Sequence, residues 1–544
     1  MKSKISNASK LPSLRLADEK CQKAVALLNR QKYHDALVIL DSILKQQPEH
    51  RLAKRSKPVA LFHMGQQHEA AKLFHQLHAQ DPDDLVILKH CGIAYTAIGA
   101  FDLAIRFLSR YVKSNPNDFD AWTSLSAAAG KSQKYVESMM YATKALSLEP
   151  TNPVAYNNLG ATLLGVNKLK EGEQAFETAL ILHKGNVDAL SNLATLAQQR
   201  GDHEAAVVLY NNLLANLDDN TPFAKEVLYR SSFSHLATGR LREGWRRYDY
   251  GFFPTDLSSR TPKRHFQVPQ WHGESLGDKR LLIWGEQGLG DELWYFGLVN
   301  EAKTICSNIT IECEPRLVTL FIRSFPDITV RAANNNNQKN SAIDYDYHIP
   351  VGSLMGIFRS QIDDIKKFTP YIQTNKSISE DFSIRLEPYK GKILAGICWR
   401  SGKINANRIQ NYLPLNAFKD VLKLKNFIFV NLQYDDCGEE IEKIENDIGI
   451  EILRWNDIDL RNNQEQVAAL IGQLDVVISA GTAVAEMAYA VGTRLIRFGR
   501  GGGWRFMGEK IFPWCNNDDL YVRPEIAGEL QSVIPKIYSE LKIM

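Results

Sequence analysis

Apolar residues recur with a helical period through residues 17–252, and this pattern repeats along the chain. Four prolines stand 34 residues apart, each after an apolar helical stretch: Pro48, Pro82, Pro116 and Pro150. Small and large apolar residues keep the same phase between them, as at Trp122, Leu125, Ala129, Ala142 and Ala145. Such a period predicts pairs of helices in which small residues allow close approach and large residues fill the space between pairs.

A 34-residue period with proline after the second helix is typical of the tetratricopeptide (TPR) repeat. The phase predicts six regular units beginning near residues 17, 51, 85, 119, 153 and 187, and a degenerate seventh over about 221–252. Residues 1–16 are expected to form a disordered or short leader. Stacked repeats make a superhelix whose concave face grips an extended peptide or a partner helix. The alternative is an array that supports its neighbour or associates with itself.

After residue 252 the helical period stops, and a proline-bearing linker or wrap is predicted over 253–277. Strand-like apolar runs then alternate with helical segments: Arg280–Trp284, Ile309–Cys313, Asp344–Ile349, Ile393–Trp399, Phe427–Leu432, Leu474–Ser479 and Arg494–Phe498. This alternation favours parallel sheets covered by helices. We therefore expect a TPR α-solenoid followed by α/β structure, with two Rossmann-like domains over 278–387 and 388–544 that face each other across a cleft.

Composition narrows the class of function. The formal net charge of +3 provides no basic field for nucleic acid, and no window has the roughly 18 apolar residues of a membrane span. Seven scattered cysteines without a CxxC pair indicate reduced thiols in a cytoplasm rather than disulfides or a metal site. The GxSxG, HExxH and GxxxxGK[ST] motifs are missing.

The first α/β block opens with a strand, a glycine-rich turn (Glu286, Gln287, Gly288 and Gly290) and a helix starting near Asp291. Exposed amides at a helix start favour an anion, and glycines let a ligand approach the backbone. A dinucleotide site is one alternative, in which Glu312 or Glu314 would bind the ribose. However, the glycines are not spaced as GxGxxG. A plain N-cap role for Asp291 is another.

Polar turns also follow the strands of the second block, at the edge where parallel strands place their ligands. Thr482 can offer its hydroxyl and the helix-start amides to a phosphate, and Glu486 can bind a ribose hydroxyl. At each position, the packing needs of a tight turn are the alternative. The candidate donor-side residues are Trp399, Arg400, Ser401, Gln433, Gly481, Thr482, Glu486, Gly501 and Gly502. Asp344 and Asp346 form a D-x-D pattern that we interpret as structural.

Several of these segments occur together, in the same order, in one bacterial family. They are GRLREGWRRYDY, PQWHGESLGDKRLLIWGEQGLGDELWYF, YDYHIPVGSL, GICWRSG, NLQ and GTAVAEMAYAVG. The chain resembles, over nearly its whole length, bacterial proteins in which TPR repeats are fused to a GT-B glycosyltransferase related to the heptosyltransferases.

The resemblance implies an inverting, metal-independent transferase that uses a nucleotide-sugar and needs no cofactor. The donor would bind mainly in the second domain and the acceptor in the first. Asp291 matches the family's proposed general base, which takes the proton of the attacking hydroxyl. Arg400, Thr482 and the Gly501–Gly503 turn could stabilise the leaving phosphate.

One departure concerns the donor pocket: relatives read D-T-A-x-A-H where this chain has Gly481 to Glu486. The nucleotide, and activity itself, therefore stay open. Related TPR-fused enzymes resemble flagellin glycosyltransferases, whose repeats hold the protein acceptor and whose donor can be a CMP-nonulosonic acid. Three hypotheses follow: a cytoplasmic protein O-glycosyltransferase, a transferase for a glycan or lipid-linked acceptor, and a non-catalytic TPR scaffold.

Overall fold

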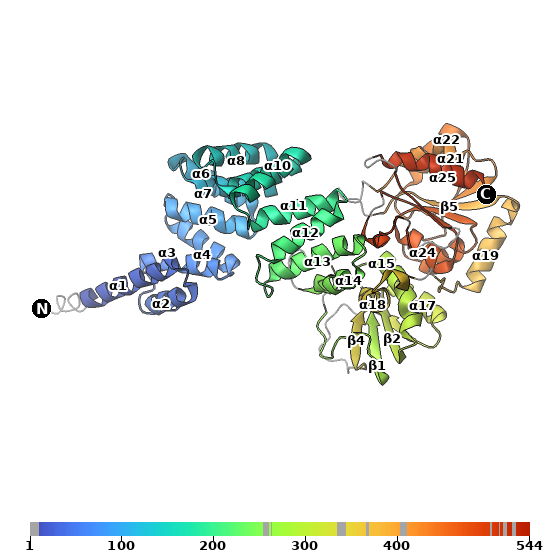
Figure 1. Ribbon diagram of the computed structural model, residues 1–544, viewed down its shortest axis with the longest axis horizontal. Helices are drawn as coiled ribbons and strands as arrows, with labels where there is room; N and C mark the ends of the chain where they lie inside the picture. Colours follow the sequence, from blue (N-terminus) through green and yellow to red (C-terminus); the bar gives the residue numbers. More distant parts are fainter. Residues whose placement is uncertain are drawn as a thin grey trace. The chain divides into compact units, whose positions relative to one another are not determined.

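A computed structural model describes most of the chain: residues 10–253, 260–262, 264–333, 344–365, 369–402, 411–500, 503–510, 512–514, 519–524 and 529–544. The chain separates into two compact units, residues 1–196 and 197–544 (Figure 1). Gly501 and Gly502 lie outside the described residues, so the structure says nothing of their predicted donor role.

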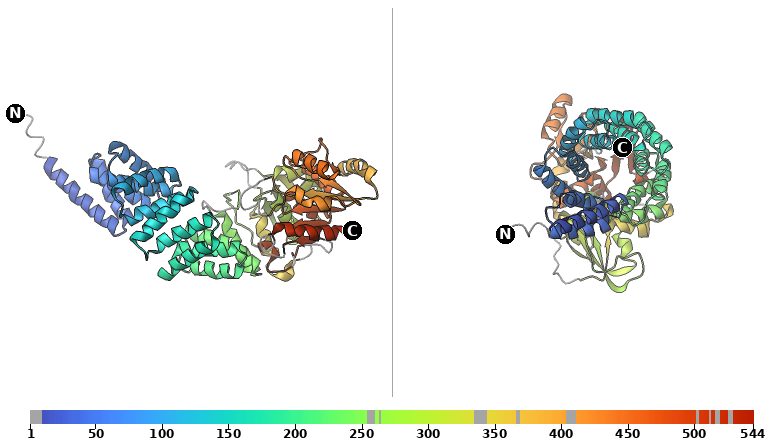
Figure 2. Two further views of the ribbon diagram at one scale, coloured as in Figure 1. Left: turned by 90° about the horizontal axis from the view of Figure 1, so that it is seen from above. Right: turned by 90° about the vertical axis from the view of Figure 1, so that its left-hand side faces the viewer.

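The first unit consists of antiparallel helix pairs, one pair for each 34-residue repeat. Successive pairs stack side by side (Figure 2). The helices are α1 (Lys10–Asn29), α2 (Tyr33–Gln46), α3 (Arg51–His63), α4 (Gln67–Gln80), α5 (Leu85–Ala97), α6 (Phe101–Ser114), α7 (Phe119–Lys131), α8 (Tyr135–Leu148), α9 (Pro153–Gly165), α10 (Leu169–Leu182) and α11 (Val187–Gln199). Because α1 already begins at Lys10, the leader predicted over residues 1–16 is too long.

Small residues set the spacing within these pairs. Leu125, Ala129, Phe176 and Ala179 are fully buried. A side chain added at Gly160 of α9 would place its Cβ 2.6 Å from Cε1 of Phe176 and 3.0 Å from the carbonyl oxygen of Gly172 in α10. Glycine is therefore required by packing at this position, where the helix itself would favour alanine.

Gly160→Ala is expected to destabilise the first unit by about 1–3 kcal/mol, because overpacking outweighs the gain of about 1 kcal/mol in helix propensity. Urea unfolding followed by circular dichroism measures the change. Gly438→Ala is the matched control, since no heavy atom lies within 4 Å of an added Cβ at the start of α22 (Gly438–Ile448). Equal stability of the two variants would contradict the packing argument.

The second unit begins with helices that continue the repeat phase: α12 (His203–Leu214), α13 (Pro222–Ala237) and α14 (Leu241–Tyr248). The repeat array was predicted to end at residue 252, yet the compact units divide at residue 196. Side-chain contacts give the reason. The Trp245 indole donates to the carbonyl oxygen of Arg359 over 3.0 Å, and the Tyr248 and Tyr295 hydroxyls lie 2.9 Å apart. These aromatic residues share one core with the α/β region.

A four-stranded parallel sheet follows, with strand order β3-β2-β1-β4. Its strands are β1 (Gly277–Trp284), β2 (Cys306–Cys313), β3 (Thr329–Ala332) and β4 (Tyr347–Pro350). Helices α15 (Leu289–Tyr295), α16 (Val299–Ala302), α17 (Val318–Ser324) and α18 (Leu354–Phe358) connect or follow them. Within the segment predicted as linker, Trp271 is fully buried and its backbone bonds the carbonyl oxygen of His348. The described part of this segment is thus an ordered wrap.

The second sheet has six parallel strands in the order β10-β9-β8-β5-β6-β7. They are β5 (Ile393–Cys398), β6 (Phe427–Asn431), β7 (Ile452–Leu453), β8 (Val476–Ala480), β9 (Leu495–Phe498) and β10 (Leu520–Val522). Numbered within this sheet, the order is 3-2-1-4-5-6, which is that of a Rossmann sheet. Helices α19 (Lys376–Leu386), α21 (Lys419–Leu422), α22, α23 (Gln464–Ile471), α24 (Ala483–Val491) and α25 (Val533–Lys542) accompany it.

Candidate functional site

In each sheet, the strands next to the topological switch point, where the strand order reverses direction, lead into predicted site residues. In the first sheet the switch lies between β1 and β4, and β1 leads directly into the turn that begins at Gly285. In the second it lies between β5 and β8, which lead into Trp399 and Gly481. Ligands of parallel α/β sheets bind beyond the strand ends at such points. Both predicted turns therefore lie where ligand sites form.

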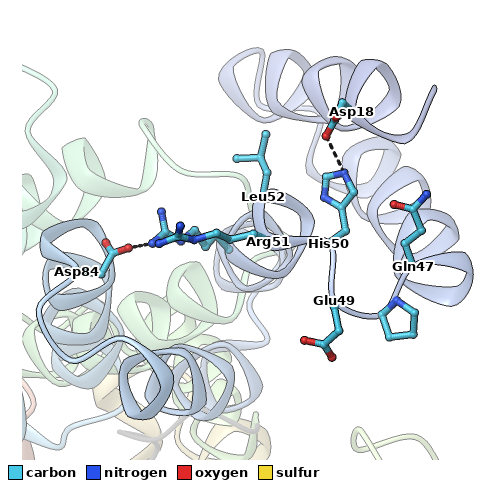
Figure 3. A pocket seen from close by; sticks show the side chains of 9 residues that line it. Asp18, Gln47, Glu49, His50, Arg51, Leu52 and Asp84 are labelled. Atoms are coloured by element: carbon cyan, nitrogen blue, oxygen red, sulfur yellow. Dashed lines mark ion pairs between the residues drawn. The ribbon is translucent and has the colours of Figure 1, made fainter. Parts of the chain in front are cut away.

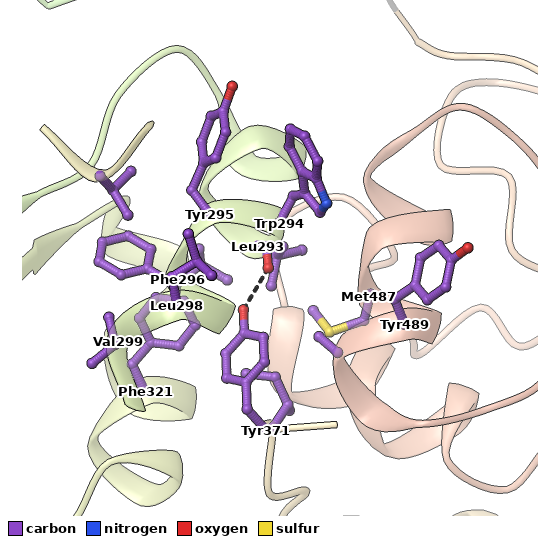
Figure 4. Packing of buried hydrophobic residues seen from close by; sticks show 14 of the residues in the cluster. Leu293, Trp294, Tyr295, Phe296, Leu298, Val299, Phe321, Tyr371, Met487 and Tyr489 are labelled. Carbon is purple, nitrogen blue, oxygen red and sulfur yellow. Dashed lines mark hydrogen bonds between the residues drawn. The ribbon is translucent and has the colours of Figure 1, made fainter. Parts of the chain in front are cut away.

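Helices α15 and α24, each following a switch-point strand, pack against each other. A Cβ added at Gly290 of α15 would lie 3.3 Å from the Cα of Ala483 in α24. The segment at Tyr371 joins both helices: its hydroxyl donates to the Leu293 carbonyl over 2.6 Å, and its amide donates to the Ala490 carbonyl (Figure 4). Gly290, predicted to contact ligand, thus serves this close helix packing.

Asp291 is linked to α24 by an arginine that sequence analysis did not select. An Arg505 amino group lies 3.0 Å from Oδ1 of Asp291, and its other amino group lies 2.6 Å from Oε1 of Glu486. The same Glu486 oxygen lies 2.9 Å from Nη2 of Arg497 in β9. Four alternating charges, Asp291, Arg505, Glu486 and Arg497, form a continuous chain that we call the charge relay.

Packing fixes the centre of the charge relay. The Arg505 guanidinium carbon lies 4.2 Å from the centre of the Trp294 ring, and the Arg505 carbonyl accepts from the Trp514 indole over 2.8 Å. Burial lowers the pKa of Arg505, but Glu486 and Asp291 outweigh it and raise that pKa. Arg505 therefore stays charged beside the carboxylate of Asp291, whose side chain is 35% exposed.

Asp291 is not the N-cap of its helix. Helix α15 begins at Leu289 with Gly288 as the N-cap, so Asp291 lies within the first turn. The N-cap interpretation of Asp291 is therefore wrong, and its described ionic partner is Arg505.

Glu486 was predicted to bind a ribose hydroxyl, but it is 4% exposed beneath two arginines. Burial raises the pKa of its carboxyl, and Arg497 and Arg505 together more than reverse that effect and lower it. Its ionised carboxylate holds Arg505 next to Asp291. The structure therefore assigns Glu486 a supporting position rather than an open one.

Glu286, predicted to line the acceptor cleft, is 1% exposed. Its carboxylate accepts hydrogen bonds from Arg260 and, over 2.9 Å, from the Gly352 amide after β4. Neighbouring Gln287 is exposed, with φ at +68°, and its amide side chain donates to the Tyr248 hydroxyl. Glu286 thus connects the turns that follow β1 and β4. It was expected to contact the acceptor, but in the structure it bonds Arg260 and the Gly352 amide instead.

Glu292 is a buried carboxyl directly under the glycine turn. An added Cβ at Gly285 would collide with its carboxylate, and Oε2 accepts from the Glu314 amide over 2.8 Å. Burial is the largest cause that raises the pKa of Glu292, and the nearby charges of Glu314, Glu286 and Asp291 raise it further. The hydrogen bond from the Glu314 amide lowers it, and the result is a pKa of about 8. Glu292 is therefore protonated in the folded protein at neutral pH.

The raised pKa of Glu292 predicts a pH-dependent stability. The ordinary value is 4.5, so between pH 4.5 and about 8 the folded state holds a proton that the unfolded state has lost. Stability from this group is full below pH 4.5 and declines with rising pH by at most about 1.4 kcal/mol per unit. Glu292→Gln should remove this decline in urea unfolding measured from pH 5 to 8.5. Parallel pH curves for the two proteins would contradict it.

Three residues predicted to contact the nucleotide-sugar form hydrogen bonds with one another. The Gln433 side-chain oxygen accepts from the amides of Trp399 and Arg400, both over 3.1 Å. Trp399 is fully buried, and the Arg400 guanidinium is held by Asp435 over 2.9 Å and by Glu440. These residues hold the loops after β5 and β6 together. Direct contacts of their side chains with a nucleotide-sugar are therefore not supported.

Of the remaining donor-side candidates, Gly481 is exposed, whereas Thr482 and Ser401 are buried. Thr482 is the N-cap of α24, where its hydroxyl accepts from the Val484 amide over 3.3 Å. The Ser401 hydroxyl accepts from Tyr434 over 3.2 Å. Of these three residues, only Gly481, which precedes the N-cap of α24, is exposed.

The D-x-D aspartates form ion pairs with arginines. Asp344 pairs with Arg331, and Asp346 lies 3.2 Å from Nε of Arg280. Among the residues described, no group of three or more His, Cys, Asp or Glu could hold a metal ion. No helix in the described ranges is long and apolar enough to cross a membrane.

The repeat unit has a polar pocket of about 800 Å³ around the start of α3 (Figure 3). His50 is the N-cap of α3, and its Nε2 lies 3.1 Å from Oδ1 of Asp18. Arg55 and Asp84, which also line the pocket, form an ion pair. Charged and hydrogen-bonding groups of this kind are suited to a polar segment of a partner.

One family model and several relatives match the chain. The family model of the Psidin N-terminal TPR repeats region matches residues 19–238. Protein FlbA of Caulobacter vibrioides is 29% identical over 432 residues, covering 76% of this chain and 71% of that protein. A DnaJ homolog subfamily C member 3 homolog of Dictyostelium discoideum is 23% identical over 218 residues, covering 37% of this chain and 43% of that protein.

Several solved structures of repeat proteins are similar to part of the chain. A tetratricopeptide repeat protein from Parabacteroides merdae is 13% identical with a TM-score of 0.37, covering 44% of this chain and 94% of its own. MamA from Desulfovibrio magneticus is 19% identical with a TM-score of 0.29, covering 31% of this chain and 96% of its own. The family match and the paired helices together identify TPR repeats in the N-terminal part of the chain.

Proposed function

We propose that the chain is a glycosyltransferase of the GT-B type that moves a sugar from a nucleotide-sugar to Ser or Thr of a protein acceptor. One observation carries the proposal. The relay through Arg505 links Asp291, beyond the first sheet, to α24, whose start lies beyond the second. This contact supports the proposal because an acid near the end of one parallel sheet is linked to a helix that starts at the end of the other, where ligands of such sheets bind.

The proposed chemistry is a single displacement. The Asp291 carboxylate takes the proton of the acceptor hydroxyl as its oxygen attacks the anomeric carbon. The bond to the nucleotide breaks as the new bond forms, and the electron pair leaves with the phosphate. Arg505, which lies between Asp291 and Glu486 of α24, would stabilise the charge that develops there.

The repeats would hold the acceptor protein. Asn158 and Asn192 stand at equivalent positions of successive repeats, and their amide groups donate to Thr123 and Asn157 of the repeat before each. Such rows of amides can bond an extended peptide backbone. Flagellin is the suggested acceptor, a CMP-nonulosonic acid the suggested donor, and the cytoplasm the place of reaction.

Thermal stabilisation by nucleotides tests the donor site before any acceptor is known. Wild-type protein is heated with CMP, UDP, GDP or ADP, and with ADP-ribose and NAD as controls. A ligand at 100 times its dissociation constant stabilises the folded state by about 2.7 kcal/mol. A shift with one nucleotide names the donor class, and CMP would indicate a nonulosonic acid. No shift with any of the four would count against the transferase.

A non-catalytic scaffold is the second candidate, and the internal bonds of the predicted donor residues favour it. Arg400 is bonded by Asp435 and Glu440, and Gln433 by the loop after β5. Both side chains are thus used to hold loops together. A scaffold would bind partner protein through its repeats yet release no nucleotide from any nucleotide-sugar.

A further inference from the structure

Arg497 is a buried cation whose hydrogen-bonding capacity is only partly used. It belongs to β9, between the buried residues Ile496 and Phe498, and is 6% exposed. Nη2 lies 2.9 Å from the Glu486 carboxylate, whereas Nε and Nη1 are buried and have no hydrogen-bond partner among the described residues. An unmet donor on a buried charged group costs free energy, so such a group calls for an explanation.

The edge of Arg497 formed by the unpaired Nε and by Nη2, which also bonds Glu486, lies behind Gly481. A Cβ added at Gly481 would be 3.1 Å from Nη2 and 3.6 Å from Nε of Arg497. We call the space left by the missing side chain the Gly481 notch. Because Gly481 itself is exposed, this notch opens at the surface beside the switch point of the second sheet.

Backbone conformation does not explain the glycine. Gly481 is not among the glycines with positive φ, so any residue can adopt its conformation. The three atoms nearest to an added Cβ all belong to the guanidinium of Arg497. The effect of glycine here is therefore to leave the Nε–Nη2 edge of Arg497 without a covering side chain.

The surroundings of the notch favour a negatively charged atom. An oxygen in the Cβ position would lie within hydrogen-bond distance of Nη2. It would also lie at the start of α24, a nine-residue helix whose N-cap is Thr482. Glu486 is the acid that faces Arg497, and it is already shared by Arg497 and Arg505.

We propose that Arg497 and the Gly481 notch bind an oxyanion, either a phosphate or a carboxylate, of the ligand at the second switch point. This inference rests on the proposed function for the identity of that ligand, a nucleotide-sugar. Arg497 is then the residue that selects a negatively charged nucleotide-sugar. A neutral group in the Gly481 notch would leave N–H groups of Arg497 without a hydrogen-bond acceptor. A phosphate of the nucleotide and a carboxylate of an acidic sugar are the two sources of this chemistry.

Calorimetric titration of the full chain distinguishes the two sources. The probes are inorganic phosphate, pyrophosphate, CMP, UDP and free N-acetylneuraminic acid. Gly481→Ala fills the notch and needs only a small shift of the flexible end of Arg497. Gly438→Ala, at the start of α22 with open space around it, is the matched control. Arg497→Lys keeps the charge but loses the guanidinium edge.

At least one probe is expected to bind the wild type and the Gly438→Ala protein equally. Gly481→Ala and Arg497→Lys are expected to bind it at least tenfold more weakly, with the melting temperature of Gly481→Ala unchanged. Binding by phosphate-bearing probes identifies a phosphate site, and binding by the acidic sugar a carboxylate site. No binding of any probe, or equal binding by Gly481→Ala, would overturn the proposal.

The outcome for the transferase is separate. Oxyanion binding that depends on the notch, without any sugar transfer, would keep the anion site and reject the proposed function. Sugar transfer by Gly481→Ala with unchanged donor affinity would reject the anion site and keep the transferase.

Discussion

Arg260→Met is expected to destabilise the second unit by about 3–5 kcal/mol, because it leaves the Glu286 carboxylate buried without its cation. The Arg260 side chain is fully buried and pairs with Glu286 and, over 3.0 Å, with Asp249. Its guanidinium carbon also lies 4.2 Å from the centre of the Tyr248 ring and 4.1 Å from that of Phe252. Urea unfolding followed by tryptophan fluorescence reports on this unit, since eight of the nine tryptophans belong to it.

Two further variants make the interpretation specific. Arg260→Met combined with Glu286→Gln should recover part of the loss, because the second change removes the unpaired charge. Arg280→Met breaks an exposed pair with Asp346 and should leave the unfolding midpoint unchanged. A single Arg260→Met variant as stable as Arg280→Met would contradict the assigned role of the buried pair.

Asp291→Asn is expected to lower the rate of sugar transfer by about 10²- to 10⁴-fold, because an amide cannot accept the proton of the acceptor hydroxyl. The change keeps the size of the side chain, so the fold and nucleotide binding should be retained. Nucleotide release from the donor, measured with and without acceptor, gives the rate.

Asp346→Asn is the matched control for this experiment. It makes the same chemical change at the aspartate that precedes β4 and pairs with Arg280 rather than Arg505. Its transfer rate should equal that of the wild type. Wild-type transfer by Asp291→Asn would remove Asp291 from the role of base.

The elements that sequence predicted well are those with a local signal. The 34-residue period indicates each helix pair because the two helices of a pair are neighbours in sequence. Long apolar runs such as Phe427–Leu432 likewise indicate buried strands. Sequence missed β3, β7 and β10, which have two to four residues each. Strands this short carry too few apolar positions for a pattern to be seen.

Long-range partners decided the parts of the site that sequence could not predict. Arg505 and Asp291 are 214 positions apart, and no local pattern links them. For the same reason the internal bonds of Glu286, Arg400 and Gln433 were not foreseen. Arg497 carried a usable signal, since a charged residue between Ile496 and Phe498 in an apolar strand requires a partner.

The central claim is that this chain transfers sugar from a nucleotide-sugar to protein. The most direct measurement incubates the full chain with a panel of nucleotide-sugars and with protein extract from cells that encode it, then determines the masses of modified peptides. We expect a sugar-sized mass increase on Ser or Thr with wild-type protein and its loss with Asp291→Asn. Unmodified peptides with every donor, or equal modification by both proteins, would contradict it.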